Sequence, residues 1–250
     1  MQQKTINQLL ELNQQFYQTF ALPFSSKRMK IQPGIRQLLP DLISQPSILD
    51  LGCGNGELAL ELYRSGFRGR YVGLDFSVNL LEIAKARVEK FPYSIRFYHA
   101  DLSKEEWFRE IQDEDFTAVV AFAVLHHIPS IEYRLRLLQD VRKILMNNKD
   151  TLQRGKFYFS VWQFLHSERQ RKRIHEWQEV GLSMQEVDEN DYLLDWKEGG
   201  FGFRYVHHFS EEELNQLAQQ CGFVVQTTFY SDGKEGNLAL YQIWEVQSMD

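Results

Sequence analysis

One stretch near the start of the chain, Ser47 to Leu58, constrains the fold more than any other. It reads SILDLGCGNGEL, so a short apolar run ending in Asp50 passes through three glycines into a helical pattern. This pattern predicts a strand that breaks over a glycine loop into a helix. Glycines let the backbone approach a ligand closely, and the helix N-terminus offers free N–H groups. The stretch therefore predicts a nucleotide-binding junction.

The composition is that of an ordinary globular protein. The 250 residues are 43% hydrophobic and 25% charged, which suits one domain with a well-buried core. Cys53 and Cys221 lie far apart and are expected to be free thiols in a reducing compartment. The N-terminus lacks the apolar core of a signal peptide, and the longest apolar run, Ala118 to Leu125, is too short to span a bilayer. We therefore expect a cytoplasmic protein without a membrane anchor.

From the glycine loop onward, strand and helix patterns alternate. The expected strands are Ile48 to Leu51, Tyr71 to Asp75, Ile95 to His99, Phe116 to Phe122 and Lys156 to Trp162. This rhythm predicts an α/β fold, with a parallel sheet, helices on both faces and ligands at the carboxyl ends of the strands. Two last strands, Phe223 to Tyr230 and Leu238 to Val246, are expected to pair antiparallel at a sheet edge.

Residues 1–46 precede this alternation and are expected to form a helical cap. They contain an amphipathic helix at Thr5 to Phe20, a loop at Ala21 to Pro33 and a second helix at Gly34 to Leu42. The loop carries Lys27 and Arg28. The ordinary explanation is a basic loop exposed to solvent, and the functional one is a cap over a cofactor carboxylate or a substrate phosphate. We predict that Lys27 and Arg28 bind substrate.

A segment at about 163–209 breaks the rhythm again. Its first part is a basic and polar stretch, and its second part is rich in aromatic residues interrupted by Gly199, Gly200 and Gly202. The glycines favour a shaped loop or hairpin over a packed helix. We expect this segment to be a substrate-side insertion in a domain that spans residues 47–250.

Three aspartates follow the first three strands. Asp50, Asp75 and Asp101 each stand at or just beyond the carboxyl end of a strand, so they are expected to converge on one crevice. Each alone has an ordinary explanation as an N-cap or turn residue. Their joint placement favours a ligand site. Asp75 stands roughly twenty residues after the glycine loop, where an acid takes the ribose hydroxyls of a nucleotide.

Two adjacent histidines, His126 and His127, follow the fourth strand in the sequence AVLHHIP. No further histidine or carboxylate nearby has metal-ligand spacing, so no metal site is expected. A histidine at the mouth of the crevice suits a substrate contact or a base, and a hydrogen-bonded structural histidine is the alternative. Either His126 or His127 could be such a base, and we take His126 as the candidate catalytic residue.

The glycine loop narrows the identity of the cofactor. A glycine loop with an acid after the second strand fits NAD as well as S-adenosylmethionine. The loop is G-x-G-x-G, without the third glycine of the dinucleotide fingerprint, and the chain has no second mononucleotide half. In this order, LDLGCGNG, GLDFS, Asp101-Leu102 and AFAVLHHIP resemble the class I S-adenosylmethionine-dependent methyltransferases. That resemblance implies a Rossmann-like, seven-stranded, mostly parallel sheet with a C-terminal antiparallel strand.

The resemblance also implies the cofactor contacts. The glycine loop would pack against the methionine part, Asp75 would bind the ribose, and Asp101 with Leu102 would border the adenine. The predicted cofactor-binding residues are Asp50, Gly52, Cys53, Gly54, Gly56, Asp75, Phe76, Ser77, Asp101, Leu102, Phe122 and Ala123.

A narrower resemblance concerns the methyl acceptor. AVLHHI, the pair Val161-Trp162 and RYVHHF at Arg204 to Phe209 are similar to the methyltransferases that esterify the carboxymethyl group on the wobble uridine of tRNA. The net charge of −6 supplies no long-range attraction to RNA, although a local basic patch can still bind it. A small-molecule or protein acceptor is the alternative. A further alternative is a subunit that binds the cofactor without catalytic activity. A small partner subunit that activates this chain is also a candidate partner.

The acceptor decides what catalysis requires. A carboxylate is ionised at neutral pH and needs only a cation or donors, whereas a hydroxyl, phenol or amine benefits from a base. We expect Arg204, Tyr205 and His207 or His208 to present the acceptor while Trp162 walls the pocket, with a surface ion pair as the alternative role of Arg204. The predicted catalytic residues are His126, Arg204, Tyr205 and His207. The predicted substrate-binding residues are Lys27, Arg28, Trp162 and His208.

Overall fold

The computed structural model describes residues 1–27, 30–89, 95–147 and 154–247. Its centre is a seven-stranded sheet in the order β3-β2-β1-β4-β5-β10-β9. The first five strands run parallel, and β10 pairs antiparallel with both β5 and β9. The predicted Rossmann-like sheet with its antiparallel C-terminal pair is confirmed. The strands are β1 (Ser47–Leu51), β2 (Arg70–Asp75), β3 (Ile95–His99), β4 (Ala118–Phe122), β5 (Lys156–Trp162), β9 (Phe223–Ser231) and β10 (Ala239–Val246).

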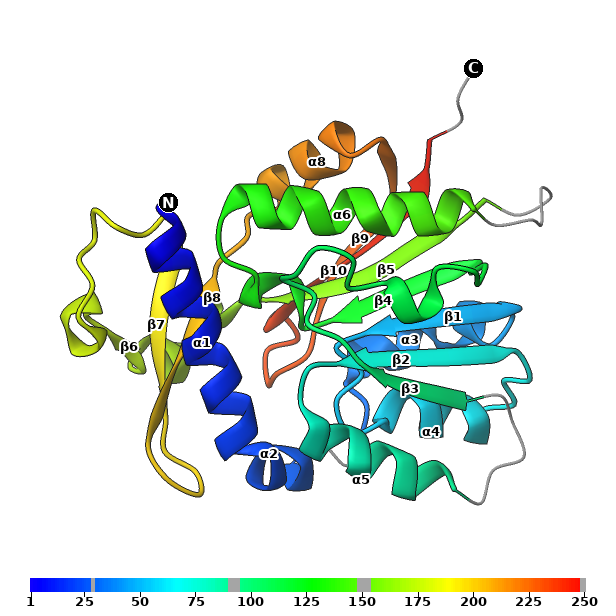
Figure 1. The fold of residues 1–250 in the computed structure, drawn as a ribbon, viewed down its shortest axis with the longest axis horizontal. Helices are drawn as coiled ribbons and strands as arrows, with labels where there is room; N and C mark the ends of the chain where they lie inside the picture. Colours follow the sequence, from blue (N-terminus) through cyan, green and yellow to red (C-terminus); the bar gives the residue numbers. More distant parts are fainter. Residues whose placement is uncertain (28–29, 90–94, 148–153, 248–250) are drawn as a thin grey trace.

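Helices cover both faces of this sheet (Figure 1). Helices α6 (Ile131–Met146) and α8 (Glu211–Gln220) pack on one face through a core that includes Leu138, Val141 and Leu217. On the other face lie α3 (Pro33–Leu42), α4 (Glu57–Arg64) and α5 (Val78–Val88). Because both faces are covered, β1 is buried along its whole length, as expected for a central parallel strand.

The segment at about 163–209 forms a second, three-stranded antiparallel sheet in the order β6-β7-β8. Its strands are β6 (Ile174–His175), β7 (Asp191–Trp196) and β8 (Gly202–His207), preceded by the short helix α7 (Glu168–Arg171). Gly199 and Gly200, with φ of +74° and +140°, lie in the connection between β7 and β8. The hairpin predicted from these glycines is therefore confirmed.

Helix α1 (Gln3–Thr19) lies between the small sheet and the large one (Figure 1). Its Leu9 packs with Leu193 and Tyr205 of the small sheet. Residues Ala21–Lys27 form helix α2, so the loop predicted to begin at Ala21 was wrong there. Helix α2 contacts the glycine loop, where Asn55 Nδ2 donates a hydrogen bond to Ser25 Oγ at 2.9 Å.

Short 3₁₀ turns complete the described chain, at Arg109–Ile111, Leu125–His127, Phe164–His166 and Trp177–Val180. The turn after β4 is the one that matters for the site, because it carries both histidines of the AVLHHIP stretch. None of the helices in the described ranges has the length and apolar character needed to cross a membrane.

Candidate functional site

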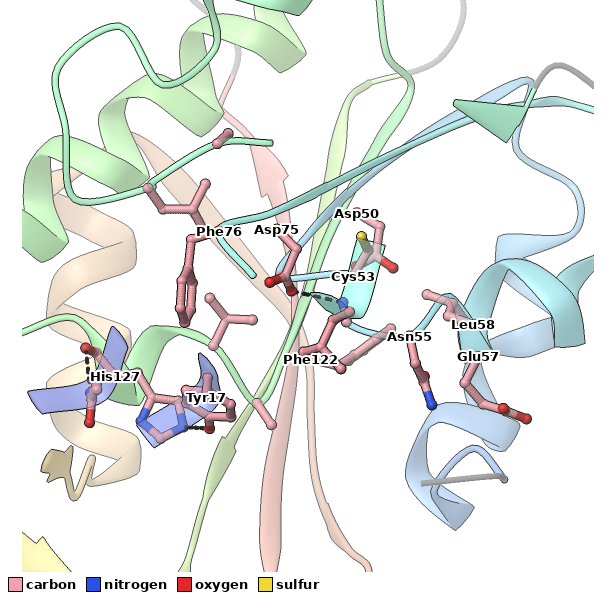
Figure 2. A pocket seen from close by; sticks show the side chains of 18 of the residues that line it. Tyr17, Asp50, Cys53, Asn55, Glu57, Leu58, Asp75, Phe76, Phe122 and His127 are labelled. Atoms are coloured by element: carbon pink, nitrogen blue, oxygen red, sulfur yellow. Dashed lines mark hydrogen bonds between the residues drawn. The ribbon is translucent and has the colours of Figure 1, made fainter. Parts of the chain in front are cut away.

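A cavity of about 200 Å³ opens at the carboxyl ends of β1, β2, β3 and β4, beneath α1 (Figure 2). Ten of the twelve residues predicted to bind the cofactor line it: Asp50, Gly52, Cys53, Gly54, Asp75, Phe76, Asp101, Leu102, Phe122 and Ala123. The other two support its walls. Gly56 is the left-handed N-cap of α4, and Ser77 is fully buried and donates its backbone N–H to Asp75. The three predicted acids therefore converge as expected from their strands.

The glycine loop brings bare backbone against the cavity. Gly52 and Gly54 adopt left-handed φ values of +68° and +54°. A Cβ on Gly52 would lie 2.5 Å from Cγ2 of Val124, so only glycine fits there. The N–H of Gly54 donates to Asp75 at 2.8 Å, which fixes the loop against the end of β2.

Asp50 and Asp75 are buried acids beside each other. The pKa of Asp50 is raised to about 7, because burial and the charge of Asp75 raise it more than a hydrogen bond from the Tyr71 hydroxyl lowers it. Burial also raises the pKa of Asp75 to about 6, although backbone N–H groups of Ser77 and Gly54 stabilise its charged form. Such a pair is costly to ionise without a nearby positive charge, and a cationic ligand would favour ionisation.

The charges around the cavity fit S-adenosylmethionine, which carries a sulfonium and an ammonium group. Among the described lining residues, carboxylates come from Asp50, Glu57, Asp75 and Asp101, and one ammonium comes from Lys30. This balance suits a cation and is unfavourable for the pyrophosphate of a dinucleotide. Apolar side chains complete the lining, as expected for a bound adenosine.

Helix α1 supplies a wall that the sequence analysis did not assign. Gln14 Nε2 donates to Asp101 Oδ2 at 2.9 Å, and the Tyr17 hydroxyl lies 2.7 Å from His127 Nε2 (Figure 2). Leu10, Gln14 and Tyr17 all line the cavity. Their spacing of four and three residues places them on one helix face. The polar residues on that face were the sequence signal that could have indicated a ligand site.

The two histidines of AVLHHIP have different positions. His127 lines the cavity, whereas the predicted catalytic residue His126 is only 2% exposed and lies outside the lining. The Nδ1 atom of His126 accepts the backbone N–H of Trp162 at 3.3 Å. His126 thus has the contacts of the structural histidine that the sequence analysis kept as the alternative. The geometry favours His127 as the residue that reaches a ligand.

Tyr205 and His207 lie in a buried polar network away from the cavity. The Tyr205 hydroxyl donates to Asp191 at 2.7 Å, and Nδ1 of His207 is also 2.7 Å from Asp191. Arg134 donates to the Tyr205 hydroxyl, and Nε2 of His207 lies 3.0 Å from Glu213. Burial raises the pKa of Tyr205, opposed by Arg134 and reinforced by Asp191. These contacts join β7 and β8 to α6 and α8, so this geometry does not support the predicted role in presenting the acceptor.

Arg204 lies in a box of aromatic rings. Its guanidinium carbon is 4.6 Å from the ring centroid of Trp162, 5.3 Å from Phe16 and 5.7 Å from Trp196. The residue is 5% exposed, so the alternative of a surface ion pair does not describe it. Neither Arg204 nor Trp162 lines the cavity, but Phe16 is the neighbour of Tyr17, which does.

His208, another predicted substrate residue, lies outside the cavity lining. Burial and the nearby His166 and His207 lower the pKa of His208 to about 4, and its ring packs 5.4 Å from that of Phe164. Lys27 is the last residue of α2, and Arg28 lies outside the described residues. Within the described part of the chain, no group of three or more His, Cys, Asp or Glu side chains could hold a metal ion.

Comparison with known proteins identifies the family. The family model described as a methyltransferase domain matches residues 25–228. The chain is 28% identical to a protein of Encephalitozoon cuniculi named as a methyltransferase, over 84% of this chain and 86% of that one. It is 24% identical to the human protein named probable tRNA methyltransferase 9B, over 83% of this chain, and spans 37% of that protein's length.

Solved structures agree on the fold. A Methanosarcina mazei structure described as an SAM-dependent methyltransferase has a TM-score of 0.64 at 22% identity, over 88% of this chain and 100% of that one. A Haloferax volcanii methyltransferase solved with the Trm112 methyltransferase activator has a TM-score of 0.53 at 16% identity, over 93% and 91% of the two chains. The chain therefore belongs to the methyltransferase domain family and has the Rossmann-like fold of the S-adenosylmethionine-dependent methyltransferases.

Proposed function

We propose that this chain transfers the methyl group of S-adenosylmethionine to an acceptor that enters between α1 and the end of β5. The observation that carries the proposal is the convergence of Asp50, Asp75 and Asp101 with the glycine loop on one acid-lined cavity. Bound S-adenosylmethionine would supply an electrophilic methyl group on a positively charged sulfur. The chain's own task is to align the acceptor with it and to exclude water.

The cofactor roles follow from the cavity walls. Asp75 would accept the ribose hydroxyls, and Asp101 with Leu102 would border the adenine. Asp50 and the backbone of the glycine loop would face the methionine part. Residues of α1 close the cavity from above, since Gln14 already holds Asp101 and Tyr17 already holds His127. A site closed by a helix excludes water from the reacting atoms.

A carboxylate on a tRNA wobble uridine is the first acceptor we propose. It is supported by the RYVHHF and AVLHHI motifs and by the name of the human relative, a tRNA methyltransferase. Arg204 supplies a buried cation beside Trp162, on the side of the cavity where β5 ends. A cation is what an ionised carboxylate needs, because it has no proton to lose.

A small-molecule or protein acceptor with a hydroxyl or amine is the second candidate. The observation that favours it is the Tyr17–His127 pair in the cavity wall, because a hydrogen-bonded imidazole suits proton transfer.

A non-enzymatic alternative is a subunit that binds the cofactor without turnover. The cavity lined by Asp75 and the glycine loop argues against a subunit that has lost its cofactor, and methyl transfer distinguishes an enzyme from a subunit that only binds the cofactor. The Haloferax neighbour was solved with an activator protein, which supports testing a small partner subunit if the isolated chain is inactive.

The test is methyl transfer from S-adenosylmethionine labelled on its methyl group into separated RNA, protein and metabolite fractions of the source cells. We expect label in one fraction with the wild-type chain and none with Asp75→Ala. Label in the RNA fraction supports the tRNA acceptor, and label in another fraction supports the second candidate. No transfer into any fraction, with and without an activating partner, would contradict the proposed function.

A further inference from the structure

Tyr17 and His127 form a hydrogen-bonded pair in the wall of the cavity. The Tyr17 hydroxyl oxygen is 2.7 Å from His127 Nε2 (Figure 2). On the other side of the ring, His127 Nδ1 is 3.1 Å from the backbone carbonyl oxygen of Tyr205. Both side chains are half-buried, and both line the cavity. The pair therefore connects the ligand space to a fixed backbone carbonyl through an imidazole ring.

The carbonyl decides which nitrogen of His127 carries the proton. A carbonyl oxygen can only accept a hydrogen bond, so Nδ1 must be the protonated nitrogen. In the neutral ring Nε2 then has a lone pair, and the Tyr17 hydroxyl donates to it. The phenol proton is thus committed to His127. The remaining lone pairs of the Tyr17 oxygen can only accept a hydrogen bond from a third group.

The carbonyl itself is held in place from two sides. Asn13 Nδ2 donates to the same Tyr205 oxygen at 3.2 Å, and the Tyr205 side chain is anchored by Asp191 and Arg134. The neighbouring His126 cannot replace His127, because its Nδ1 is occupied by the Trp162 N–H and its ring is buried outside the lining.

We infer that Tyr17 and His127 form a proton relay that selects an acceptor whose nucleophilic oxygen carries a proton, a hydroxyl or a phenol. The inference rests on the proposed methyl transfer and narrows its acceptor, favouring the second candidate, with a hydroxyl, over the tRNA carboxylate. A hydroxyl can donate to the Tyr17 oxygen, whereas a carboxylate would place its lone pairs against the lone pairs of the phenol. An unionised hydroxyl is a weak nucleophile until its proton leaves, so it is the class of acceptor that gains from a base.

The relay accounts for the proton and the charge released in methyl transfer. As the acceptor oxygen forms its bond to the methyl carbon, the carbon–sulfur bond breaks and its electron pair stays on sulfur. The acceptor's proton passes to the Tyr17 oxygen, and the Tyr17 proton passes to His127 Nε2. The positive charge that leaves the sulfur is then carried by the imidazolium, whose Nδ1–H still donates to the Tyr205 carbonyl. Tyr17 would touch the acceptor, and His127 acts through Tyr17.

The first test does not need activity. In protein labelled with nitrogen-15 histidine, two-bond proton–nitrogen correlation spectra report the tautomer of each ring. We expect His127 to be protonated at Nδ1, and we expect Tyr17→Phe to shift its Nε2 resonance. Tyr133→Phe is the matched control, because the Tyr133 hydroxyl, on α6 and away from the cavity, accepts a hydrogen bond from Gln3 of α1. A ring protonated at Nε2, or one that does not respond to Tyr17→Phe, would overturn the relay.

The second test uses the product. The methyl group transferred by the wild-type chain should be stable to mild alkali, as in an ether. Tyr17→Phe should slow transfer by about 100-fold, the scale of acid–base catalysis, with cofactor affinity within a factor of about two of the wild type. An alkali-labile methyl ester would overturn this inference and leave methyl transfer intact. Absence of transfer would instead contradict the proposed function, while the tautomer measurement would still decide the relay.

Discussion

The side chain of Asn13 pairs with both backbone groups of Tyr205, as a neighbouring strand would. The Tyr205 N–H donates to Asn13 Oδ1 at 2.8 Å, and Asn13 Nδ2 donates to the Tyr205 carbonyl at 3.2 Å. Asn13 is 5% exposed, so these bonds are shielded from water. They join α1 to β8 beside the cavity, which makes α1 part of the site rather than a detached extension.

Asn13→Ala should therefore destabilise the chain. The substitution leaves the buried N–H of Tyr205 without its partner, which costs about 1–3 kcal/mol. Denaturant unfolding of the two proteins measures this loss. Asn7→Ala, an exposed position on the same helix, is the control and should change stability by less than about 0.5 kcal/mol. An equal effect at both positions would contradict the docking role of Asn13.

Asp50→Asn should change how stability depends on pH. The folded-state pKa of Asp50, about 7, lies above the ordinary aspartate value, so the folded state binds a proton that the unfolded state releases. This stabilising contribution is complete below about pH 4 and is lost as pH rises through about 7. We expect wild-type apoprotein to lose stability between pH 5 and 8 more steeply than Asp50→Asn, as followed by thermal unfolding. Parallel curves for the two proteins would refute the assigned pKa.

Cofactor binding should show the opposite pH dependence. A cationic ligand favours the ionised forms of Asp50 and Asp75, so affinity for S-adenosylmethionine should weaken as pH falls through about 7 and about 6. Calorimetric titrations across this range measure the effect. An affinity that is constant from pH 8 to pH 5.5 would show that these acids do not face the cofactor's charge.

Gly52→Ala should disrupt the glycine loop by more than backbone strain alone. A left-handed φ costs a non-glycine residue about 1–2 kcal/mol, and here the new Cβ would also meet Val124 at 2.5 Å. Gly181 has a similar φ of +73° with nothing within 4 Å of its Cβ position, so Gly181→Ala isolates the strain. We expect Gly52→Ala to lose more stability in denaturant unfolding and to weaken cofactor binding. Equal losses for both variants would count against close packing of the loop.

The tRNA carboxylate candidate predicts that Arg204→Ala lowers turnover, because the variant removes the cation beside Trp162. Cofactor affinity should change little, because the aromatic box lies outside the cofactor cavity. Arg204→Lys keeps the charge and should retain more activity if a cation is what the acceptor needs. The comparison requires the acceptor identified by label transfer. Unchanged turnover in Arg204→Ala, together with lost cofactor binding in Asp75→Ala, would remove Arg204 from the acceptor site and keep the cofactor assignment.

The sheet and the cofactor cavity were predictable because their signals are local. The glycine loop, Asp75 and Asp101 each sit next to a strand end that the hydrophobic pattern marks, and parallel strands bring such ends to one edge. The antiparallel pair β9 and β10 was predictable for the same reason, since both strands and their turn are contiguous in sequence.

The acceptor side was less predictable because its contacts are distant in sequence. Tyr205 and His207 were expected to face a ligand, but Arg134, 71 residues before Tyr205, and Asp191 enclose them in a buried network. Tyr17 is 110 residues from His127, and no local pattern reports that α1 brings them together. Such positions follow from how α1 and the small sheet dock, which the order of residues in one element does not determine.

The most direct test of the central claim is calorimetric titration of S-adenosylmethionine into the wild-type chain and into Asp75→Ala. The acid-lined cavity predicts one binding site per wild-type chain and a loss of affinity of at least about tenfold in the variant, since a charge-assisted hydrogen bond contributes about 1.5–3 kcal/mol. Absence of binding by a folded wild-type chain, or equal affinity in the two proteins, would contradict the assignment of this cavity to the cofactor.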